Sequence, residues 1–419
     1  MAGKTISEKI LSATSDSDAR AGDVVVCTLD YALGTDGSTP MAIDYFNEMG
    51  GDRVSHPERF AFSLDHYSPP NSSNSARLHD RIRQFALDQG IRTFEVGEGI
   101  GLQRMVEIGW CLPGGLVVGA DSHSVTFGAL NTFGTGIGSS DLAAAMISGQ
   151  VWLRVPETTK VRLEGELSEG VYPKDIALAL VGQLGQEGAN YQTLEFHGSA
   201  VPTLTIDDRL VVSNLVVEAG AKAGIFMADA RTEAYLIGRT DAAYTPVDPD
   251  ADAHYVREVV IDLSQLGPQL ARPHEPDDVV PLSAGAGTRV DMVFIGTCTG
   301  GRTRDFHQAL EILTAGGGVA PGVVLVVTPA SRQVLLDLML DGSLERFTRM
   351  GAVLTTPGCG ACCGTAGVIP GDGMTVISTA NRNFKARMGN ATAQIYLASP
   401  ASCAAAAVTG MITDPRRSA

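Results

Sequence analysis

The sequence predicts an α/β protein of three domains built around mostly parallel sheets. Short apolar runs that suit buried strands are followed by loops and then by helical patterns along the 419 residues, an arrangement that indicates parallel sheets. This length is too great for one ordinary domain. Two polar segments that contain Pro and Gly, RVPETTKVRLEGELSEG and ARPHEPDDVVPLSAGAG, mark two seams. We therefore expect domains at about 1–156, 157–283 and 284–419.

Composition and charge exclude several classes of protein. The formal net charge is −16 and no basic run is longer than Arg416-Arg417, so we expect no nucleic-acid groove, which needs clustered Lys and Arg. No apolar run approaches the roughly 18 residues that span a bilayer, so we expect no membrane contact. Seven cysteines and an N-terminus without a charged-then-apolar leader point to a reducing compartment, and the cytoplasm fits.

The first hundred residues predict alternating helices and strands. We expect a short amphipathic helix over Ile6–Ser12 and a strand over AGDVVVCTLDYAL, residues 21–33. PMAIDYFNEMG, residues 40–50, predicts a helix that ends at its Gly. A longer helix should follow over residues 75–90.

Two predicted strands end in an acid and a histidine. FAFSLDHYSPP places Asp65 and His66 at a strand end, and GGLVVGADSH does the same with Asp121 and His123. One such pair in isolation is more typical of a structural His, because adjacent side chains in a strand point to opposite faces. The repetition favours function. Two acid/His pairs at strand ends would supply general acid-base groups to one crevice.

Three cysteines lie near the ends of apolar strands in the C-terminal third. Cys298 follows VDMVFIGT, and GAVLTTPGCGACCG presents Cys359 and Cys362 in a CxxC pattern. Loops that leave the carboxyl ends of neighbouring parallel strands converge on one crevice. Three thiolates leave one corner of a metal site open, which is where chemistry takes place. The alternative interpretation is a CxxC redox pair or a partial zinc site, with Cys298 as a small buried residue.

Six motifs give the chain a resemblance to the aconitase superfamily over nearly its whole length. In order they are SLDHYSPP, GADSHSVTFGAL, NLVVEAGAKAGIF, GTCTGGR, PGCGACCG and TANRNFKARMG. The compact length resembles the large subunit of enzymes of the 3-isopropylmalate dehydratase and homoaconitase type. The resemblance implies a hydro-lyase or isomerase that moves a hydroxyl group between adjacent carbons of a hydroxy di- or tricarboxylic acid. Isopropylmalate-like and homocitrate-like acids are the expected substrates, and the sequence does not separate them from dimethylmalate-like or citrate-like acids.

The resemblance implies a 4Fe-4S cluster bound by Cys298, Cys359 and Cys362, whose fourth iron has no protein ligand and binds substrate and water. Elimination of hydroxide needs a Lewis acid on the leaving oxygen, a proton donor, and a base for a weakly acidic carbon. The open iron would supply the first of these. Asn214 and Asn381 resemble neighbours of the cluster.

The same resemblance implies roles for the acid-base groups. His66, held by Asp65, resembles the proton donor to the leaving hydroxyl, while Asp121 and His123 resemble partners of the iron-bound water. Glu218 resembles the carboxylate that pairs with His123.

Substrate-binding residues are implied in two motifs. Ser122 lies in the second acid/His motif, and Arg382 and Arg387 match arginines that bind substrate carboxylates. A planar guanidinium binds a carboxylate through two hydrogen bonds, which suits a diacid. Taken alone, these two arginines would more often be solvated surface charges.

The sequence departs from the family pattern at three positions and adds a cysteine. Leu102 stands where the family usually has a His that pairs with Asp121, Thr35 replaces a common His, and Gly300 replaces an Asn near the cluster. These changes imply either an altered substrate or weakened cluster chemistry. We interpret the extra Cys363 as a small buried residue, because a fourth thiolate would close the open corner.

A partner is also implied by the resemblance. Long aconitases carry a further C-terminal domain with a serine base and more arginines, whereas this sequence ends soon after the motif TANRNFKARMG. We therefore expect a small subunit that carries this swivel domain. The alternative is a non-catalytic or iron-sensing aconitase-like protein with a degenerate site, for which Leu102 and Gly300 are the motivation. The negative charge speaks against an RNA-binding version of it.

Overall fold

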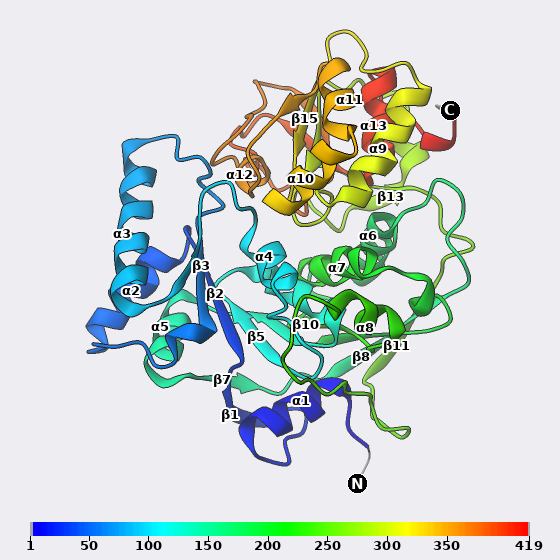
Figure 1. The fold of residues 1–419 in the computed structure, drawn as a ribbon. Coiled ribbons are helices and arrows are strands. Elements are labelled where there is room, and N and C mark those ends of the chain that lie inside the picture. Colours follow the sequence, from blue (N-terminus) through cyan, green and yellow to red (C-terminus); the bar gives the residue numbers. More distant parts are fainter. Residues whose placement is uncertain (1–2, 418–419) are drawn as a thin grey trace.

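Four β-sheets organise the part of the chain that the computed structural model describes, residues 3–417 (Figure 1). The first sheet has five parallel strands in the order β4-β3-β2-β5-β6. They are β2 (Tyr31–Thr35), β3 (Phe60–Ser63), β4 (Arg92–Phe94), β5 (Leu116–Gly119) and β6 (Phe133–Gly136). The helices of this region are α1 (Ile6–Ser15), α2 (Thr39–Glu48), α3 (Ser73–Gln89), α4 (Gly101–Glu107) and α5 (Ser139–Ser148).

The single strand expected over residues 21–33 is two strands that belong to different sheets. β1 (Val24–Thr28) pairs antiparallel with β7 (Gln150–Arg154) in a separate ribbon, and β2 lies inside the parallel sheet. The side chains of β1 alternate between exposed and buried, whereas those of β2 are buried almost throughout. An exposed ribbon and a central parallel strand have these two patterns. The expectation of a single strand was wrong, because it treated residues 21–33 as one apolar run. It did not distinguish the part in which apolar residues alternate with exposed ones from the part that is buried continuously.

The second sheet has four parallel strands in the order β10-β9-β8-β11. They are β8 (Thr158–Glu164), β9 (Thr193–His197), β10 (Ala223–Phe226) and β11 (Arg257–Asp262). The helices α6 (Pro173–Leu184), α7 (Ile206–Leu215) and α8 (Ala230–Leu236) belong to this region. Helix α6 begins with Pro at its first position, where the missing N–H costs nothing.

The third sheet has seven strands in the order β13-β12-β18-β17-β14-β15-β16. They are β12 (Gln269–Ala271), β13 (Val279–Pro281), β14 (Met292–Gly296), β15 (Val324–Thr328), β16 (Val353–Leu354), β17 (Thr375–Ser378) and β18 (Gln394–Leu397). The pairings of β12 are antiparallel and the others are parallel. Its helices are α9 (Thr303–Ala315), α10 (Arg332–Leu340), α11 (Ser343–Arg349), α12 (Gly360–Cys363) and α13 (Pro400–Thr409).

The three larger sheets follow one another along the chain, and β12 and β13 join the third sheet although they precede residue 283. The mostly parallel α/β fold is therefore confirmed. Short 3-10 segments complete the chain at Pro57–Arg59, Ser122–Leu130, Val201–Thr203, Val216–Ala219, Leu282–Gly285 and Pro415–Arg417. No helix within residues 3–417 has the length and apolar character needed to cross a bilayer.

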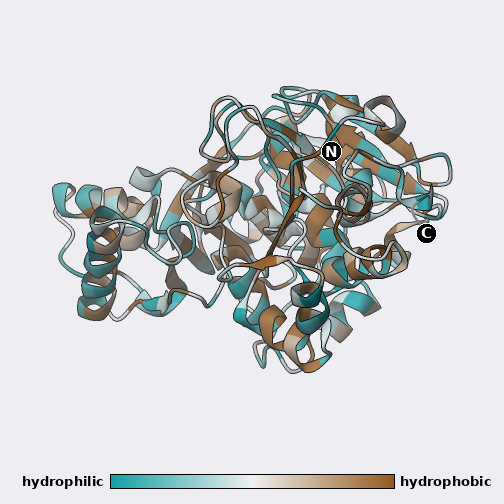
Figure 2. Cartoon of the chain, turned by 90° about the horizontal axis from the view of Figure 1, so that it is seen from above, coloured by the Kyte–Doolittle hydropathy of each residue, from teal (hydrophilic) through white to brown (hydrophobic). Residues whose placement is uncertain are grey.

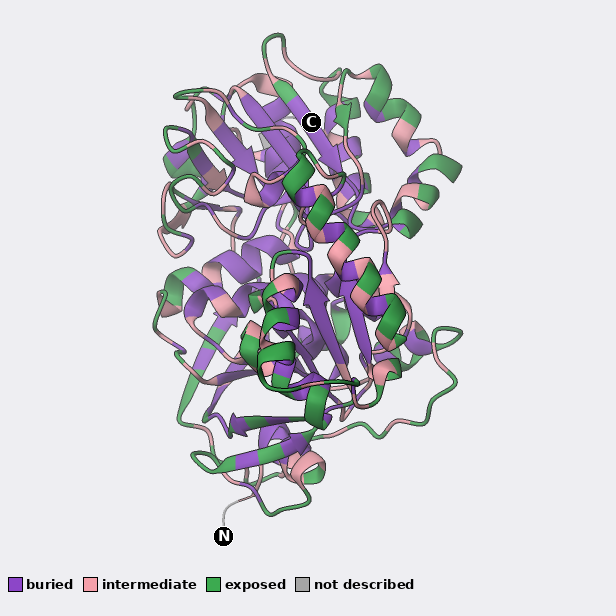
Figure 3. Ribbon diagram, turned by 90° about the vertical axis from the view of Figure 1, so that its left-hand side faces the viewer, coloured by how far each residue is buried: buried purple, intermediate pink, exposed green. Residues whose placement is uncertain are grey.

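One hydrophobic core connects the three regions. It includes Leu33 and Phe94 of the first sheet, Leu210 of α7, and Phe294 of the third sheet. Brown, apolar strands lie inside the molecule, while the outer helices carry teal, polar residues (Figure 2). The same strands are buried, and the solvent-facing sides of the surrounding helices are exposed (Figure 3). The candidate site borders this shared core, since Cys298 belongs to it.

Candidate active site

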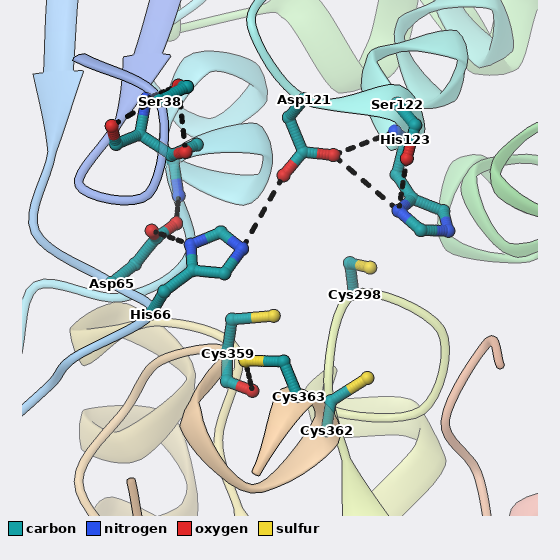
Figure 4. Close-up of polar contacts among 12 residues, drawn as sticks. Ser38, Asp65, His66, Asp121, Ser122, His123, Cys298, Cys359, Cys362 and Cys363 are labelled. Atoms are coloured by element: carbon teal, nitrogen blue, oxygen red, sulfur yellow. Dashed lines mark hydrogen bonds and ion pairs between the residues drawn. The ribbon is translucent and has the colours of Figure 1, made fainter. Parts of the chain in front are cut away.

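The predicted site residues gather where strands of two sheets end. Asp65 lies two residues beyond β3, Asp121 two residues beyond β5, and Cys298 two residues beyond β14. Cys359 precedes the first residue of α12 and forms its N-terminal cap. The two acid/His pairs face the cysteines across a shared space (Figure 4). Parallel strands thus bring together side chains that are far apart in the sequence.

The imidazole of His66 lies between two carboxylates. Its Nδ1 is 2.7 Å from Oδ1 of Asp65, and its Nε2 is 3.8 Å from Oδ2 of Asp121. The other oxygen of Asp65 accepts a hydrogen bond from the backbone N–H of Gly101 at 2.7 Å. Burial alone lowers the pKa of His66, but the charge of Asp65 and hydrogen bonds to Asp36 and Asp65 outweigh it and raise that pKa well above its usual value. The ring is therefore held as a cation that can give up a proton.

Asp36 completes this arrangement, although the sequence analysis did not single it out. This buried carboxylate directly follows β2 and accepts the backbone N–H groups of His66 at 3.0 Å and Tyr67 at 2.9 Å. Its Oδ2 is also 2.9 Å from Nε2 of the fully buried His79. Burial alone raises the pKa of Asp36, but the hydrogen bonds to His66 and His79 hold it well below its usual value. A fixed anion therefore positions the His66 loop.

A second chain of polar contacts runs from Asp121 to Arg382. Asp121 caps the segment Ser122–Leu130 by accepting the backbone N–H of His123 at 2.7 Å. Nε2 of His123 is 3.0 Å from Oε1 of Glu218, and Nε of Arg382 donates to both Glu218 oxygens at 2.8 and 3.1 Å. Burial alone raises the pKa of both carboxyls, but His123 lowers it at both and Arg382 lowers it further at Glu218. Both carboxylates therefore stay ionised near neutral pH.

The thiols of Cys298 and Cys362 are buried and accompanied by polar side chains. Nδ2 of Asn214 donates to Sγ of Cys298 at 3.1 Å, and Nδ2 of Asn381 donates to the same sulfur at 3.4 Å. The Cys362 thiol donates to Oδ1 of Asn381 at 3.4 Å and accepts from Nη2 of Arg387 at 3.6 Å. Burial raises the pKa of Cys298 to about 12, whereas the Cys359 hydrogen bond and then the Arg387 charge lower the pKa of Cys362.

The thiols of Cys298, Cys359 and Cys362 are spaced too widely for one metal ion. Within residues 3–417, no set of three potential ligands whose atoms all lie within 4.8 Å of one another includes Cys298 or Cys362. A tetrahedral ion with sulfur about 2.3 Å away holds two thiolates about 4 Å apart. Thiolates that are farther apart and receive hydrogen bonds suit a polynuclear iron–sulfur group, whose potential depends on such bonds.

Each expected substrate-binding side chain lies next to another predicted site residue. Ser122 is exposed, and its Oγ is 3.5 Å from Nδ1 of His123. Arg382 is partly exposed and uses Nε on Glu218, so its terminal amino groups remain for another anion. Arg387 is partly buried beside Cys362, and its Nε has no partner among the described residues. An unpaired buried donor is what an incoming carboxylate would satisfy.

Similarity to known proteins extends over nearly the whole chain. Residues 8–289 and 285–410 match the model of the aconitase family (aconitate hydratase). The chain belongs to the aconitase family. It is 44% identical over 415 residues to 3-isopropylmalate dehydratase large subunit 1 of Methanopyrus kandleri, with 99% of each chain covered. It is 46% identical over 416 residues to 3-isopropylmalate dehydratase large subunit 2 of Archaeoglobus fulgidus, again with 99% of each covered.

A relative that is named as a homoaconitase is similar to the same extent. The probable methanogen homoaconitase large subunit of Methanosarcina mazei is 44% identical over 394 residues, which is 94% of this chain and 100% of the relative. Among solved structures, aconitase X (holo-form) of Thermococcus kodakaraensis has a TM-score of 0.51 and 14% identity, covering 90% of this chain and 88% of the other. This last likeness shows that the aconitase-like fold is shared.

The structure shows what surrounds two of the departures from the aconitase-family pattern. Leu102, which is 2% exposed, packs in the core that borders the site, so no imidazole reaches Asp121 from α4. The imidazoles near Asp121 are those of His66 and His123, at 3.8 Å and 3.5 Å from its carboxylate oxygens. At Gly300, a Cβ would lie 2.4 Å from both Cβ and Oγ1 of Thr379. The Thr379 side chain therefore occupies the space that an Asn at position 300 would need.

Replacing Gly300 with alanine is expected to lower the free energy of unfolding by about 1–3 kcal/mol, the usual cost of overpacking. The added methyl group would meet the branched Thr379, which is fixed by a 2.9 Å hydrogen bond to the backbone N–H of Gly296. Urea unfolding of the purified chain measures this change. Gly267→Ala is the control, because nothing lies within 4 Å of the added Cβ there, and it should change stability by less than about 0.5 kcal/mol. Equal effects at the two positions would refute the steric argument.

Lys174 is a buried cation beside the site that the sequence analysis did not identify. Its Nζ donates to the backbone carbonyls of Ala380 at 2.7 Å and Thr379 at 3.1 Å, and to Oγ1 of Thr299 at 3.3 Å. No carboxylate of the described residues lies within ion-pair distance of it. Burial lowers the pKa of Lys174 to about 8. The side chain therefore ties α6 to the loops that carry Cys298 and Arg382.

Proposed function

We propose that this chain is the cluster-bearing large subunit of a hydro-lyase or isomerase. It dehydrates and rehydrates a 3-isopropylmalate-like, homoaconitate-like or related hydroxy di- or tricarboxylic acid. The observation that carries this proposal is the arrangement of three buried thiols, with hydrogen-bond donors on two of them, opposite His66 and its two carboxylate neighbours (Figure 4). The relatives that cover the whole chain are named 3-isopropylmalate dehydratase and homoaconitase.

The thiols of Cys298, Cys359 and Cys362 would hold a 4Fe-4S cluster. When bound, such a cluster supplies a Lewis acid at the iron that lacks a protein ligand, which weakens the bond between carbon and the leaving hydroxyl. Asn214 and Asn381 would donate hydrogen bonds to the sulfur of Cys298.

His66 would donate the proton that the departing hydroxyl needs. Asp65 and Asp36 hold the ring and keep it protonated, and Asp121 beside Nε2 stabilises the cation until the proton leaves. In the rehydration direction the same ring would take the proton from water, with Asp121 as its neighbour.

The guanidinium groups of Arg382 and Arg387 would bind the substrate carboxylates, with Ser122 as a further hydrogen-bonding group. Glu218 accepts two hydrogen bonds from Arg382 and fixes its direction, while His123 on the same carboxylate ties it to the Asp121 loop. The distance between the substrate-binding Arg382 and the acid-base groups of the Asp121 loop would thus stay constant.

A small subunit would complete the enzyme. The relatives are named as large subunits, which implies a partner chain for them. For this chain we propose a partner that carries a swivel domain with the base that removes the proton from carbon. The chain alone should then bind its cluster and turn over substrate poorly. The non-catalytic alternative has no support among the relatives described above.

Changing Cys298 to Ser is expected to abolish the cluster. Anaerobic reconstitution of the wild-type chain should give about four iron and four sulfide per chain, with a broad visible absorption and a three-iron spin-resonance signal after mild oxidation. The serine variant should lose all of these. Cys27→Ser is the matched control, because Cys27 is equally buried but lies in the core of the first region.

The outcome that would contradict the proposal is a folded wild-type chain that assembles no cluster, or a Cys298→Ser variant that keeps about four iron. Once the cluster is established, assays with the small subunit should compare 3-isopropylmalate-like and homoaconitate-like acids. Turnover of neither class by the loaded, assembled protein would refute the proposed reaction while leaving the cluster assignment in place.

A further inference from the structure

A second set of ligands overlaps the cluster thiols without including all of them. The Sγ atoms of Cys359 and Cys363 and one ring nitrogen of His66 all lie within 4.8 Å of one another. In Figure 4 the Cys363 sulfur turns to the side of Cys359 and away from Cys298. We propose that the cluster-free chain binds one soft divalent cation of the zinc type through His66, Cys359 and Cys363.

The two thiols have a spacing that suits a single ion. Cys359 caps α12 and Cys363 is its last residue, so they stand four positions apart on one helical turn and on one face. Two thiolates on a tetrahedral zinc-type ion lie about 4 Å apart, with metal–sulfur distances of about 2.3 Å. The Sγ atoms of Cys359 and Cys363 now lie no more than 4.8 Å apart. They would therefore have to approach each other by less than about an ångström to bind one ion.

The protein already holds the helix against the histidine loop. The backbone N–H of Cys359 donates to the carbonyl of Asp65 at 2.8 Å, and Oγ1 of Thr365 donates to the carbonyl of His66. The same hydroxyl is 3.0 Å from Sγ of Cys363. The three ligands therefore belong to one hydrogen-bonded unit, and little ordering is left for the metal to accomplish.

His66 has the outer contact that metal-binding histidines typically make. Its Nδ1 lies 2.7 Å from Oδ1 of Asp65, so the proton at Nδ1 points to the carboxylate and Nε2 remains for a metal. A carboxylate behind the imidazole fixes the ring and makes it a better ligand. Oδ2 of Asp121 is 3.8 Å from the same Nε2.

The charges balance at this site. Binding converts the Cys359 and Cys363 thiols to thiolates and the His66 imidazolium to imidazole, so the protein loses one proton from each thiol and one from the ring as the ion enters. Two thiolates and a neutral imidazole make a divalent ion electrically neutral. A neutral complex is the form that a mostly buried site accommodates best.

The metal and the proposed cluster exclude each other, because both use Cys359, and this competition rests on the proposed function. Cys298 and Cys362 have no part in the single-ion site. A zinc-type ion would therefore mask Cys359 and His66 in the cluster-free chain and slow cluster assembly. The extra Cys363, interpreted from the sequence as a small buried residue, is then a ligand of the cluster-free form.

The test is a titration of the full chain, freed of iron under anaerobic conditions, with Co²⁺ as a spectroscopic probe and Zn²⁺ in competition with a chromophoric chelator. The wild-type chain should bind one ion with thiolate-to-cobalt absorption of two thiolates. Loss of an outer partner alone costs 10–100-fold in metal affinity, so Cys363→Ser should bind at least about 100-fold more weakly. Cys298→Ser should bind as tightly as wild type.

Reconstitution of the cluster in the same variants gives the opposite pattern. Cys363→Ser should still assemble the iron–sulfur cluster, and one equivalent of Zn²⁺ should slow assembly in the wild type but not in this variant. Cys298→Ser should fail to assemble it. Weak or absent Zn²⁺ binding by the wild type, equal affinity in Cys363→Ser, or loss of binding in Cys298→Ser would each overturn the single-ion site. None of these outcomes depends on whether the chain dehydrates a hydroxy acid.

Discussion

Replacing His66 with alanine is expected to lower the turnover of the assembled enzyme by about 10²–10⁴-fold, the usual contribution of a positioned general acid. His66 is the cationic side chain between Asp65 and Asp121, and the proposed reaction needs a proton at the leaving hydroxyl. Because His66 is not a cluster ligand in this proposal, iron and sulfide content should stay at the wild-type level. The measurement is kcat per cluster with the small subunit present. A loss smaller than about tenfold would assign the proton donor to another group.

Asp36→Asn is the companion variant that separates positioning from proton donation. The backbone N–H groups of His66 and Tyr67 donate to different oxygens of Asp36, Oδ1 and Oδ2. Asparagine keeps one of these two acceptors and removes the negative charge. The charge and hydrogen bonds of the carboxylates raise the pKa of His66, so the variant should have a lower one. Activity that needs protonated His66 is lost as pH rises through this pKa. The alkaline limb of the rate profile should therefore move to lower pH, and an unmoved limb would show that Asp36 has no influence on the ring.

The residues that sequence analysis identified share a local signal. Asp65, Asp121 and Cys298 each stand two residues beyond an apolar strand, and a polar or thiol side chain at that place in a parallel sheet points to a crevice without any knowledge of the partner strands. The fold class follows from the same pattern of strands and helices. The order in which the strands pair does not follow from this pattern. The sequence therefore does not indicate that β12 and β13 join the third sheet across the expected seam.

Other site features depend on contacts between distant segments. Asp36 follows β2 in the sequence TDG, which is typical of a turn. Its role in positioning His66 becomes visible only in the fold, where the backbone of His66 and the ring of His79 contact its carboxylate. Gly300 lies against Thr379, 79 positions later, whose side chain occupies the space that an Asn would need. A single sequence carries no record of such pairs, because each residue is ordinary in its own surroundings.

Lys174 is the clearest case of a residue whose role depends on burial. A lysine in the first turn of a helix is usually solvated, yet the third region covers Lys174, and two carbonyls and a hydroxyl accept its hydrogen bonds. A lysine buried without a carboxylate should lose its proton easily, and burial lowers its pKa to about 8 from 10.5. Negative charge on the nearby Cys298 and Cys362 opposes that shift.

Replacing Lys174 with methionine is therefore expected to remove a pH dependence of stability from the cluster-free chain. Between pH 8 and 10.5 the unfolded chain binds a proton at this lysine that the folded chain has released, so the free energy of unfolding rises with pH, by about 3 kcal/mol in all. Below pH 8 both states are protonated and the full cost of burying the charge applies. The Lys174→Met variant lacks this rise, so the unfolding free energy of the wild type minus that of the variant should increase by that amount across the interval. Urea unfolding at a series of pH values measures it.

The matched control is Lys385→Met, because Lys385 is exposed and its removal should leave the slope unchanged. The iron-loaded chain provides a second comparison. Thiolates at Cys298 and Cys362 attract the ammonium group and favour its charged form, so the rise should begin at higher pH and be smaller than in the cluster-free chain. A wild-type slope that equals the Lys174→Met slope in the cluster-free state would show that Lys174 keeps its ordinary pKa. An identical rise with and without iron would show that its charge does not interact with the thiolates.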